Sequence, residues 1–93
     1  MSVELVELGE VVVTFRLFQR ALENDAVANL WTSLKAHKMG HWGDLCDKDK
    51  ARNDDALKNG GRLLSLYKAK DVEFWISTKA DRSVTTLLLT EEY

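Results

Sequence analysis

The 93-residue sequence has no proline and a single cysteine, Cys46. One cysteine excludes an intramolecular disulfide, and with it a small disulfide-stabilised secreted scaffold. Long apolar runs are also missing, because no stretch approaches the roughly 18 residues that a membrane-spanning helix needs. The first residues include Glu4, Glu7 and Glu10 instead of a basic stretch followed by an apolar one, so no signal peptide is expected. We therefore expect a soluble, cytoplasmic protein with no membrane partner.

An excess of positive charge is lacking as well. Lys and Arg together number 13, Asp and Glu number 15, and the net charge is −2. Dedicated nucleic-acid binders usually carry a basic excess, so direct binding of nucleic acid is not the first expectation. The length allows one domain over residues 1–93, and the 45% hydrophobic content is ordinary for a folded chain.

The first quarter of the chain contains a helical pattern. Phe15, Phe18 and Leu22 follow the spacing i, i+3 and i+7, and Leu17 and Ala21 are four residues apart. Together they form an apolar stripe, with polar residues on the other side. This amphipathic pattern predicts a helix over residues 14–23 that packs on the fold through that stripe. The β-branched run 11–14 before it predicts a short strand or an extended entry. The pair Asn24 and Asp25 is expected to break this helix and to cap the next one.

Two further helices are predicted before residue 60. Over residues 26–38 the apolar positions at helical spacing are Val27, Leu30, Trp31 and Leu34. We expect Trp31 to lie in the core, because it belongs to this stripe. Asp47 is expected to cap an unusually polar helix over residues 48–59, which Gly60 and Gly61 end. Few apolar residues lie in that helix, so it should rest on the fold through a thin contact.

The last third of the chain changes to the alternating pattern of strands. Residues 63–68, 72–77 and 84–89 are β-rich runs, separated by the polar breaks 70–71 and 80–83. Such a succession predicts an antiparallel meander, to which the valine run 11–13 could add a fourth strand. The fold class expected is therefore α+β, with N-terminal helices packed on one face of a C-terminal three- to four-stranded antiparallel sheet.

Residues with metal-binding or catalytic side chains gather between positions 37 and 46. His37, His41, Asp44 and Cys46 are of types that suit zinc, but they show neither Cys-x-x-Cys nor His-Glu-x-x-His spacing. A small hydrolase using His41, Asp44 and Cys46 is the least favoured hypothesis, because no nucleophile motif frames the cysteine. We expect no metal, no cofactor and no catalytic residue. In this interpretation Asp44 caps a helix and Cys46 is buried.

Three residues outside the predicted core are candidates for recognition. Trp42 lies in a glycine-flanked loop, where it either plugs the loop onto the core or anchors a partner. Asp81 and Arg82 lie in the second turn of the meander, where an Asx-turn would leave the arginine to project. That turn is either a plain hairpin tip or a site that engages a carboxylate, a phosphate or a partner backbone.

Acidic residues lie at both ends of the chain. Glu4, Glu7 and Glu10 form one group, and Glu91 and Glu92 form the other. If the ends lie close in space, the two groups make one acidic patch that could face a basic groove on another protein. The predicted partner-binding residues are Glu4, Glu7, Glu10, Trp42, Asp44, Asp81, Arg82, Glu91 and Glu92.

An ordered set of motifs resembles a group of short bacterial proteins carried on plasmids, prophages and integrated elements. The motifs are Trp42-Gly43-Asp44, Asp49, Asn53, Gly61-Arg62-Leu63-Leu64-Ser65, Tyr67, Trp75-Ile76, Thr78, Asp81-Arg82-Ser83, Thr85-Thr86 and Glu92-Tyr93. Members of this group are labelled plasmid-related proteins or restriction–modification subunits. The resemblance covers roughly residues 37–93 and is weaker over residues 11–24. It implies a mobile-element setting, in which small acidic proteins often inhibit host defence, as anti-CRISPR proteins do.

The leading hypothesis is therefore a non-enzymatic protein-binding inhibitor from a mobile element or phage. Its partner would be a host CRISPR–Cas or other defence complex, blocked at a nucleic-acid-binding or nuclease surface. The alternative is a plasmid-maintenance protein that binds nucleic acid through basic residues of the meander, namely Arg62, Lys68, Lys70, Lys79 and Arg82. A homodimer formed by strand-edge pairing stays open, because the last strand has no lysine or proline to block it.

Overall fold

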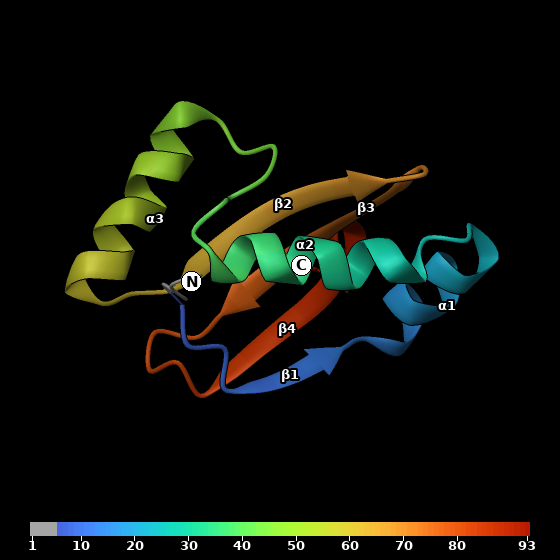
Figure 1. Ribbon diagram of the computed structural model, residues 1–93, viewed down its shortest axis with the longest axis horizontal. Helices are drawn as coiled ribbons and strands as arrows, with labels where there is room; N and C mark the ends of the chain where they lie inside the picture. The colour runs from blue at the N-terminus through green and yellow to red at the C-terminus, as the bar shows by residue number, and fades with distance from the viewer. Residues whose placement is uncertain (1–5) are drawn as a thin grey trace.

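A computed structural model describes residues 6–93 of the chain and confirms the α+β class. The elements, in chain order, are β1 (Glu10–Val13), α1 (Phe15–Glu23), α2 (Val27–Lys38), α3 (Asp47–Asn59), β2 (Leu63–Ala69), β3 (Val72–Thr78), β4 (Val84–Leu89) and a short 3-10 helix, η1 (Thr90–Glu92) (Figure 1). The predicted helices and strands all form, close to their expected bounds. Glu4 lies outside the described residues.

The four strands form one sheet in the order β1-β4-β3-β2. β2, β3 and β4 pair antiparallel, as the meander prediction requires. β1 instead runs parallel to β4, with Glu10 opposite Val84 and Val13 opposite Leu87. The sheet is therefore mixed, and the prediction of a purely antiparallel sheet is wrong for this strand. A parallel pair needs a long crossover, and the helices together with the β2–β3 hairpin provide it. β4 consequently lies inside the sheet, and the exposed edges belong to β1 and β2.

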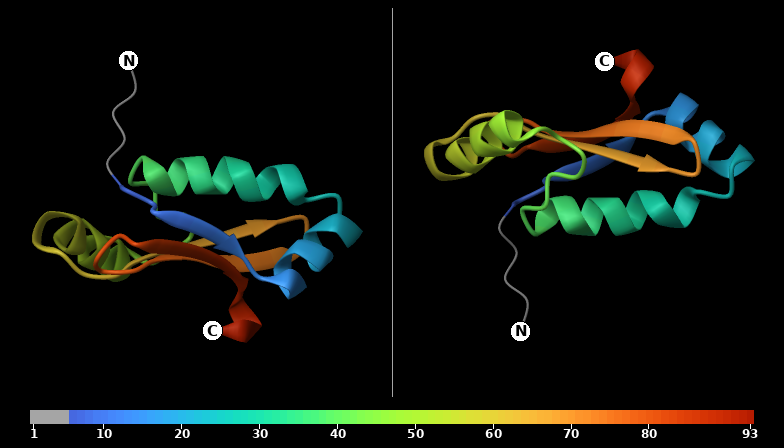
Figure 2. Two further views of the ribbon diagram at one scale, coloured as in Figure 1. Left: turned by 90° about the horizontal axis from the view of Figure 1, so that it is seen from below. Right: turned by 90° about the horizontal axis from the view of Figure 1, so that it is seen from above.

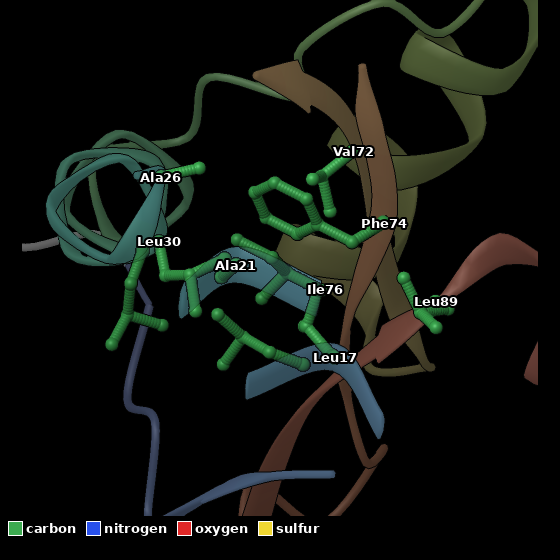
Figure 3. Close-up of a cluster of buried hydrophobic side chains, with 10 residues drawn as sticks. Leu17, Ala21, Ala26, Leu30, Val72, Phe74, Ile76 and Leu89 are labelled. Atoms are coloured by element: carbon green, nitrogen blue, oxygen red, sulfur yellow. The ribbon is translucent and has the colours of Figure 1, made fainter. Parts of the chain in front are cut away.

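α2 and the C-terminal segment lie on opposite sides of the sheet (Figure 2). α1 and α2 cover one face, where the larger core forms from residues of β3 and β4 with both helices. Phe74 and Ile76 of β3 point from the sheet toward Leu30 of α2 (Figure 3). A second cluster joins Trp42 and Leu45 to α3 and to the start of β2. The core thus has two parts, one under α1 and α2 and one beside α3.

Only part of the apolar stripe predicted for α1 faces the core, and the rest faces solvent. Leu17 and Ala21 are the buried residues of this helix. Phe15 is 77% exposed and Leu22 is 58% exposed, with Phe18 also exposed between them. Both sets have helical spacing, so periodicity alone fits either one. Only one narrow face of this short helix packs against the sheet, and Leu17 and Ala21 lie on that face.

The buried face of α2 is also rotated from the predicted one. Leu30, Leu34 and His37 are buried, whereas Trp31 is 51% exposed. The prediction that Trp31 lies in the core is wrong, because it projects about 100° around the helix from Leu30. A helix packed on a sheet buries one stripe. The buried stripe extends to His37, because the buried hydroxyl groups of Ser65 and Thr78 on the sheet form hydrogen bonds with its two ring nitrogens.

Two of the predicted helix caps are not formed by the expected side chains. The residue before α2 is Ala26 and the residue before α3 is Cys46, and neither makes a side-chain capping bond. Asp47 is the first residue of α3, not its cap, and its charge suits the positive helix N-terminus. Gly60, with φ 84°, ends α3 as predicted. Among residues 6–93, no helix combines the length and apolar character needed to cross a membrane.

Candidate functional site

The predicted acidic residues separate into two places. Glu10 donates its backbone N–H to the carbonyl of Ser83, next to Asp81, so β1 begins beside the β3–β4 turn. Glu7, Glu10 and Asp81 are therefore exposed at one end of the sheet. Glu91 and Glu92 follow the far end of β4, next to α1. Among the described residues, the two ends of the chain form no single acidic patch.

The C-terminal glutamates are engaged by α1. Glu91 pairs with Arg20 at 3.2 Å and with Arg16 at 3.9 Å, in exposed contacts. Glu92 accepts hydrogen bonds from the Thr14 hydroxyl and from the Leu89 backbone N–H, both at 2.8 Å. Thr14 also accepts from the N–H of Leu17 and so caps α1. These carboxylates fasten the C-terminal segment to the helix and are less available to a partner than Glu7 and Glu10.

Trp42 plugs its loop onto the core. It is 4% exposed, and its indole N–H donates to Oδ1 of Asp54 at 2.9 Å. Its ring meets that of His37 edge-on, with 5.6 Å between centroids. Gly43 beside it has φ 73°, and a Cβ there would lie 1.9 Å from the carbonyl oxygen of Leu66. This glycine lets the loop pair with β2, where the exposed Asp44 donates its N–H to the same oxygen. A partner could reach the tryptophan only by opening the loop.

Arg82 turns inward and binds the end of α3 instead of projecting from its turn. One guanidinium nitrogen donates to the carbonyl of Gly61 at 2.6 Å, and the other donates to that of Ala56 at 3.1 Å. Weaker bonds reach the carbonyls of Lys79 and Ala80. A cation there satisfies carbonyls at the negative end of the helix. Asp81 accepts from the backbone and hydroxyl of Ser83, which lowers the pKa of its carboxyl group.

His37 lies at the centre of a buried chain of hydrogen bonds. Nδ1 is 2.5 Å from the Ser65 hydroxyl, and Nε2 is 2.9 Å from that of Thr78. The Thr78 hydroxyl is 2.8 Å from the hydroxyl of Thr85, which donates to the carbonyl of Leu8. Because Thr85 has a single proton, Thr78 must donate to it and must accept from His37. This series of hydrogen bonds therefore fixes His37 in the tautomer with the proton on Nε2, and Ser65 donates to Nδ1.

The His, Asp and Cys residues singled out from the sequence do not converge. Both nitrogens of His37 are occupied, His41 and Asp44 are exposed, and the thiol of Cys46 faces Oδ2 of Asp49 at 3.4 Å. Cys46 is exposed, so the expectation of a buried cysteine is wrong. Within residues 6–93, no group of three or more His, Cys, Asp and Glu side chains could hold a metal ion.

The basic residues of the meander are also spread out. Lys68 lies near the end of β2, and Lys70 lies in the β2–β3 turn, where it pairs with Asp25 at 3.6 Å. Lys79 and Arg82 lie at the β3–β4 turn, at the other end of the strands. Arg62 lies near that second turn, beside Lys79. These five residues form no continuous basic groove, and Arg82 is used within the fold.

The most exposed apolar surface is one that the sequence pattern assigned to the interior. It consists of Phe15, Phe18 and Leu22 of α1. The edge strand β1 precedes this helix and exposes Val11 and Val12 on opposite faces of the sheet. We call the α1 stripe together with the β1 edge the α1–β1 surface. A double helical pattern, with apolar residues both at 15, 18 and 22 and at 17 and 21, is the signal that could have revealed it. A short helix cannot bury both stripes on one sheet.

The two edges of the sheet differ in how they are closed. At the β2 edge, Asn53 of α3 exchanges two hydrogen bonds with the backbone of Leu64, and the loop at 42–44 pairs with Leu66. At the β1 edge, Glu10 and Thr14 direct their N–H groups toward β4. Strand alternation then points the backbone groups of Val11 and Val13 outward. No strand of the described chain pairs with that side of β1.

The chain was also compared with known proteins. No protein-family model, no curated protein and no solved structure matches the chain.

Proposed function

We propose that this chain is a non-enzymatic protein-binding inhibitor that docks on its partner through the α1–β1 surface. The observation that carries the proposal is the exposed stripe on α1, in which Phe15 is 77% exposed. Exposed aromatic and aliphatic residues gathered on one face are typical of interaction sites. Aromatic side chains bury roughly 150–250 Å² each, so the stripe can supply the apolar centre of an interface of about 800 Å² per partner.

The open edge of β1 adds a second mode of contact to the same surface. The outward backbone groups of Val11 and Val13 are placed to pair with a strand of another protein. Strand addition supplies affinity through main-chain hydrogen bonds, and neighbouring side chains supply specificity. Phe15 and Phe18 follow β1 directly in the chain, so an added strand would lie beside the stripe.

Charge favours a basic partner. Glu7, Glu10 and Asp81 are exposed where β1 begins, and the whole chain carries a net charge of −2. Opposite charge on a partner speeds and directs association. A nucleic-acid-binding groove of a defence nuclease has this character. Together with the resemblance to mobile-element proteins, this supports a host defence complex as partner, with CRISPR effectors as the first candidates.

The direct test is co-purification with a panel of purified CRISPR effector complexes. We expect one member to bind, and we expect the double variant Phe15→Glu/Leu22→Glu to bind at least about tenfold more weakly. Ala51→Glu/Asn59→Glu is the matched control, because it adds the same two negative charges at exposed positions of α3. Reversing charge with Glu10→Lys should slow association, most clearly at low salt.

Three results would contradict the proposal. Failure to bind any member of a broad panel would remove the defence partner. Unchanged binding of the double variant would remove the α1–β1 surface. A homodimer in sedimentation that the double variant dissolves would show that a second copy covers this surface.

A further inference from the structure

A pocket of about 300 Å³ is lined in part by Trp75. The strand neighbours Phe74 and Ile76 face α2, so alternation along β3 places this pocket on the other side of the sheet. α3, β2, β3 and the C-terminal segment each contribute residues to its lining. Its polar lining comes from Asp49, Arg52, Asn53 and Arg62, and its aromatic lining comes from Trp75 and Tyr93. The residues come from four different elements of the fold, so only the folded chain assembles the pocket.

The aromatic residues make a surface for a flat ring. The rings of Trp75 and Tyr93 have centroids 5.9 Å apart and planes inclined by 53°. Leu45 and Leu64 extend this apolar lining. Tilted aromatic walls of this kind hold a planar ligand by stacking and edge contacts.

Two arginine side chains and one aspartate side chain supply the charged lining. Arg62 lies 5.9 Å from the centroid of the Tyr93 ring and donates one N–H to the tyrosine hydroxyl. A guanidinium has five N–H donors, so Arg62 keeps donors for an anion. Arg52 pairs with Asp49 at 3.9 Å in an exposed contact, which holds it weakly. Among the side chains of the lining, two guanidinium groups thus accompany one carboxylate.

Asn53 keeps the pocket in shape. Its side-chain N–H donates to the carbonyl of Leu64 at 2.7 Å, and its side-chain oxygen accepts the N–H of the same residue at 3.1 Å. This paired contact fixes α3 against β2, and Asn53 is buried. The pocket is therefore formed before any ligand arrives, which lowers the cost of binding.

We propose that this pocket binds a small aromatic anion, with its ring against Trp75 and Tyr93 and its phosphate or carboxylate on Arg62. A volume of about 300 Å³ is at the low end for ligand sites, so the ligand carries a single ring system. The same chemistry is offered by a nucleoside monophosphate and by an aromatic carboxylic acid. This inference does not depend on the protein partner proposed above.

The indole N–H signals of the three tryptophans make a direct test by NMR. Titration uses AMP, 4-hydroxybenzoate and, as a probe without a ring, inorganic phosphate. We expect AMP or 4-hydroxybenzoate to shift the Trp75 signal with saturation on the order of 1 mM, and the probe that does so identifies the source of the anion. Trp31 and the buried Trp42 line no part of the pocket, so their signals should stay in place.

Two exposed substitutions test the assignment without threatening the fold. Arg62→Gln should weaken binding at least about tenfold, and Tyr93→Leu should weaken it by a similar factor. Arg16 is also an exposed arginine but lies on α1, so Arg16→Gln should leave binding unchanged. The proposal fails if neither ring probe shifts Trp75, if phosphate alone shifts it as far, or if Arg62→Gln binds like the wild type.

Discussion

Nε2 of His37 lies 2.9 Å from the hydroxyl of Thr78, in a site from which water is excluded. Neutral imidazole fits that site and imidazolium does not, because burial, helped by the charge of Arg82, lowers the pKa of His37 from 6.5 to about 4. One side chain therefore couples the packing of α2 on the sheet to pH.

Stability should fall as the solution becomes acidic. The unfolded chain takes up the His37 proton near pH 6.5, whereas the folded chain resists it until about pH 4. Full stability is therefore present above pH 6.5 and is lost progressively between those values, by about 3 kcal/mol in all. Urea unfolding across this range measures the loss. His37→Gln should flatten the dependence in that window, and an equally steep profile in this variant would refute the assignment.

Replacing Trp42 by Phe should destabilise the fold more than replacing Trp31 by Phe. Trp42→Phe removes the hydrogen bond to Asp54 and part of a buried ring, so it should cost about 1–3 kcal/mol. Trp31→Phe removes exposed surface and should change stability by less than about 0.5 kcal/mol. Chemical denaturation of both variants gives the comparison. Equal losses would mean that the buried face of α2 is misplaced.

Replacing Arg82 should loosen the end of α3. Arg82→Ala leaves the carbonyls of Ala56 and Gly61 without their cationic donor, which should lower the free energy of unfolding by about 1–3 kcal/mol. Hydrogen exchange should speed up over the last turn of α3 and the β3–β4 turn. Arg16→Ala, which breaks only an exposed ion pair, is the control and should cost less than about 1 kcal/mol. Unchanged exchange near Gly61 would argue against this role.

Thr14 should hold both α1 and the C-terminal segment. Thr14→Val keeps the shape of the side chain but removes the oxygen that accepts from Leu17 and the proton that binds Glu92. We expect a loss of about 1–2 kcal/mol by thermal or chemical unfolding. Glu92→Gln keeps an acceptor oxygen and should cost less. If the two variants were equally destabilised, the carboxylate rather than the threonine cap would carry the effect.

Much of the fold follows from local patterns. Spacing and turn chemistry locate α3 and its stop at Gly60, and alternation locates the three strands of the meander with the two-residue turn at Lys70 and Asp71. These features depend on neighbours along the chain, so one sequence suffices to predict them. The direction of β1 depends on how the helices cross the sheet, and no local pattern encodes it.

The candidate sites follow the same division. The glycine-flanked loop marked Trp42 as a candidate in the sequence. Its burial depends on contacts with His37 and Asp54, which lie on two other elements. Arg82 could be placed in a turn, but its direction depends on where α3 ends. The pocket at Arg62 and Tyr93 joins residues that no spacing relates.

By itself the sequence determined the class of fold, the order of its elements and the acidic balance, because propensity, periodicity and composition act locally or as sums. Only the tertiary structure decided which of two apolar stripes on α1 is buried, which strand is an edge, and that His37 and not Trp31 enters the core. Each of those choices compares two arrangements with the same periodicity. The two arrangements differ only in the residues of the sheet that each would contact. Those contacts are defined only once the sheet is assembled.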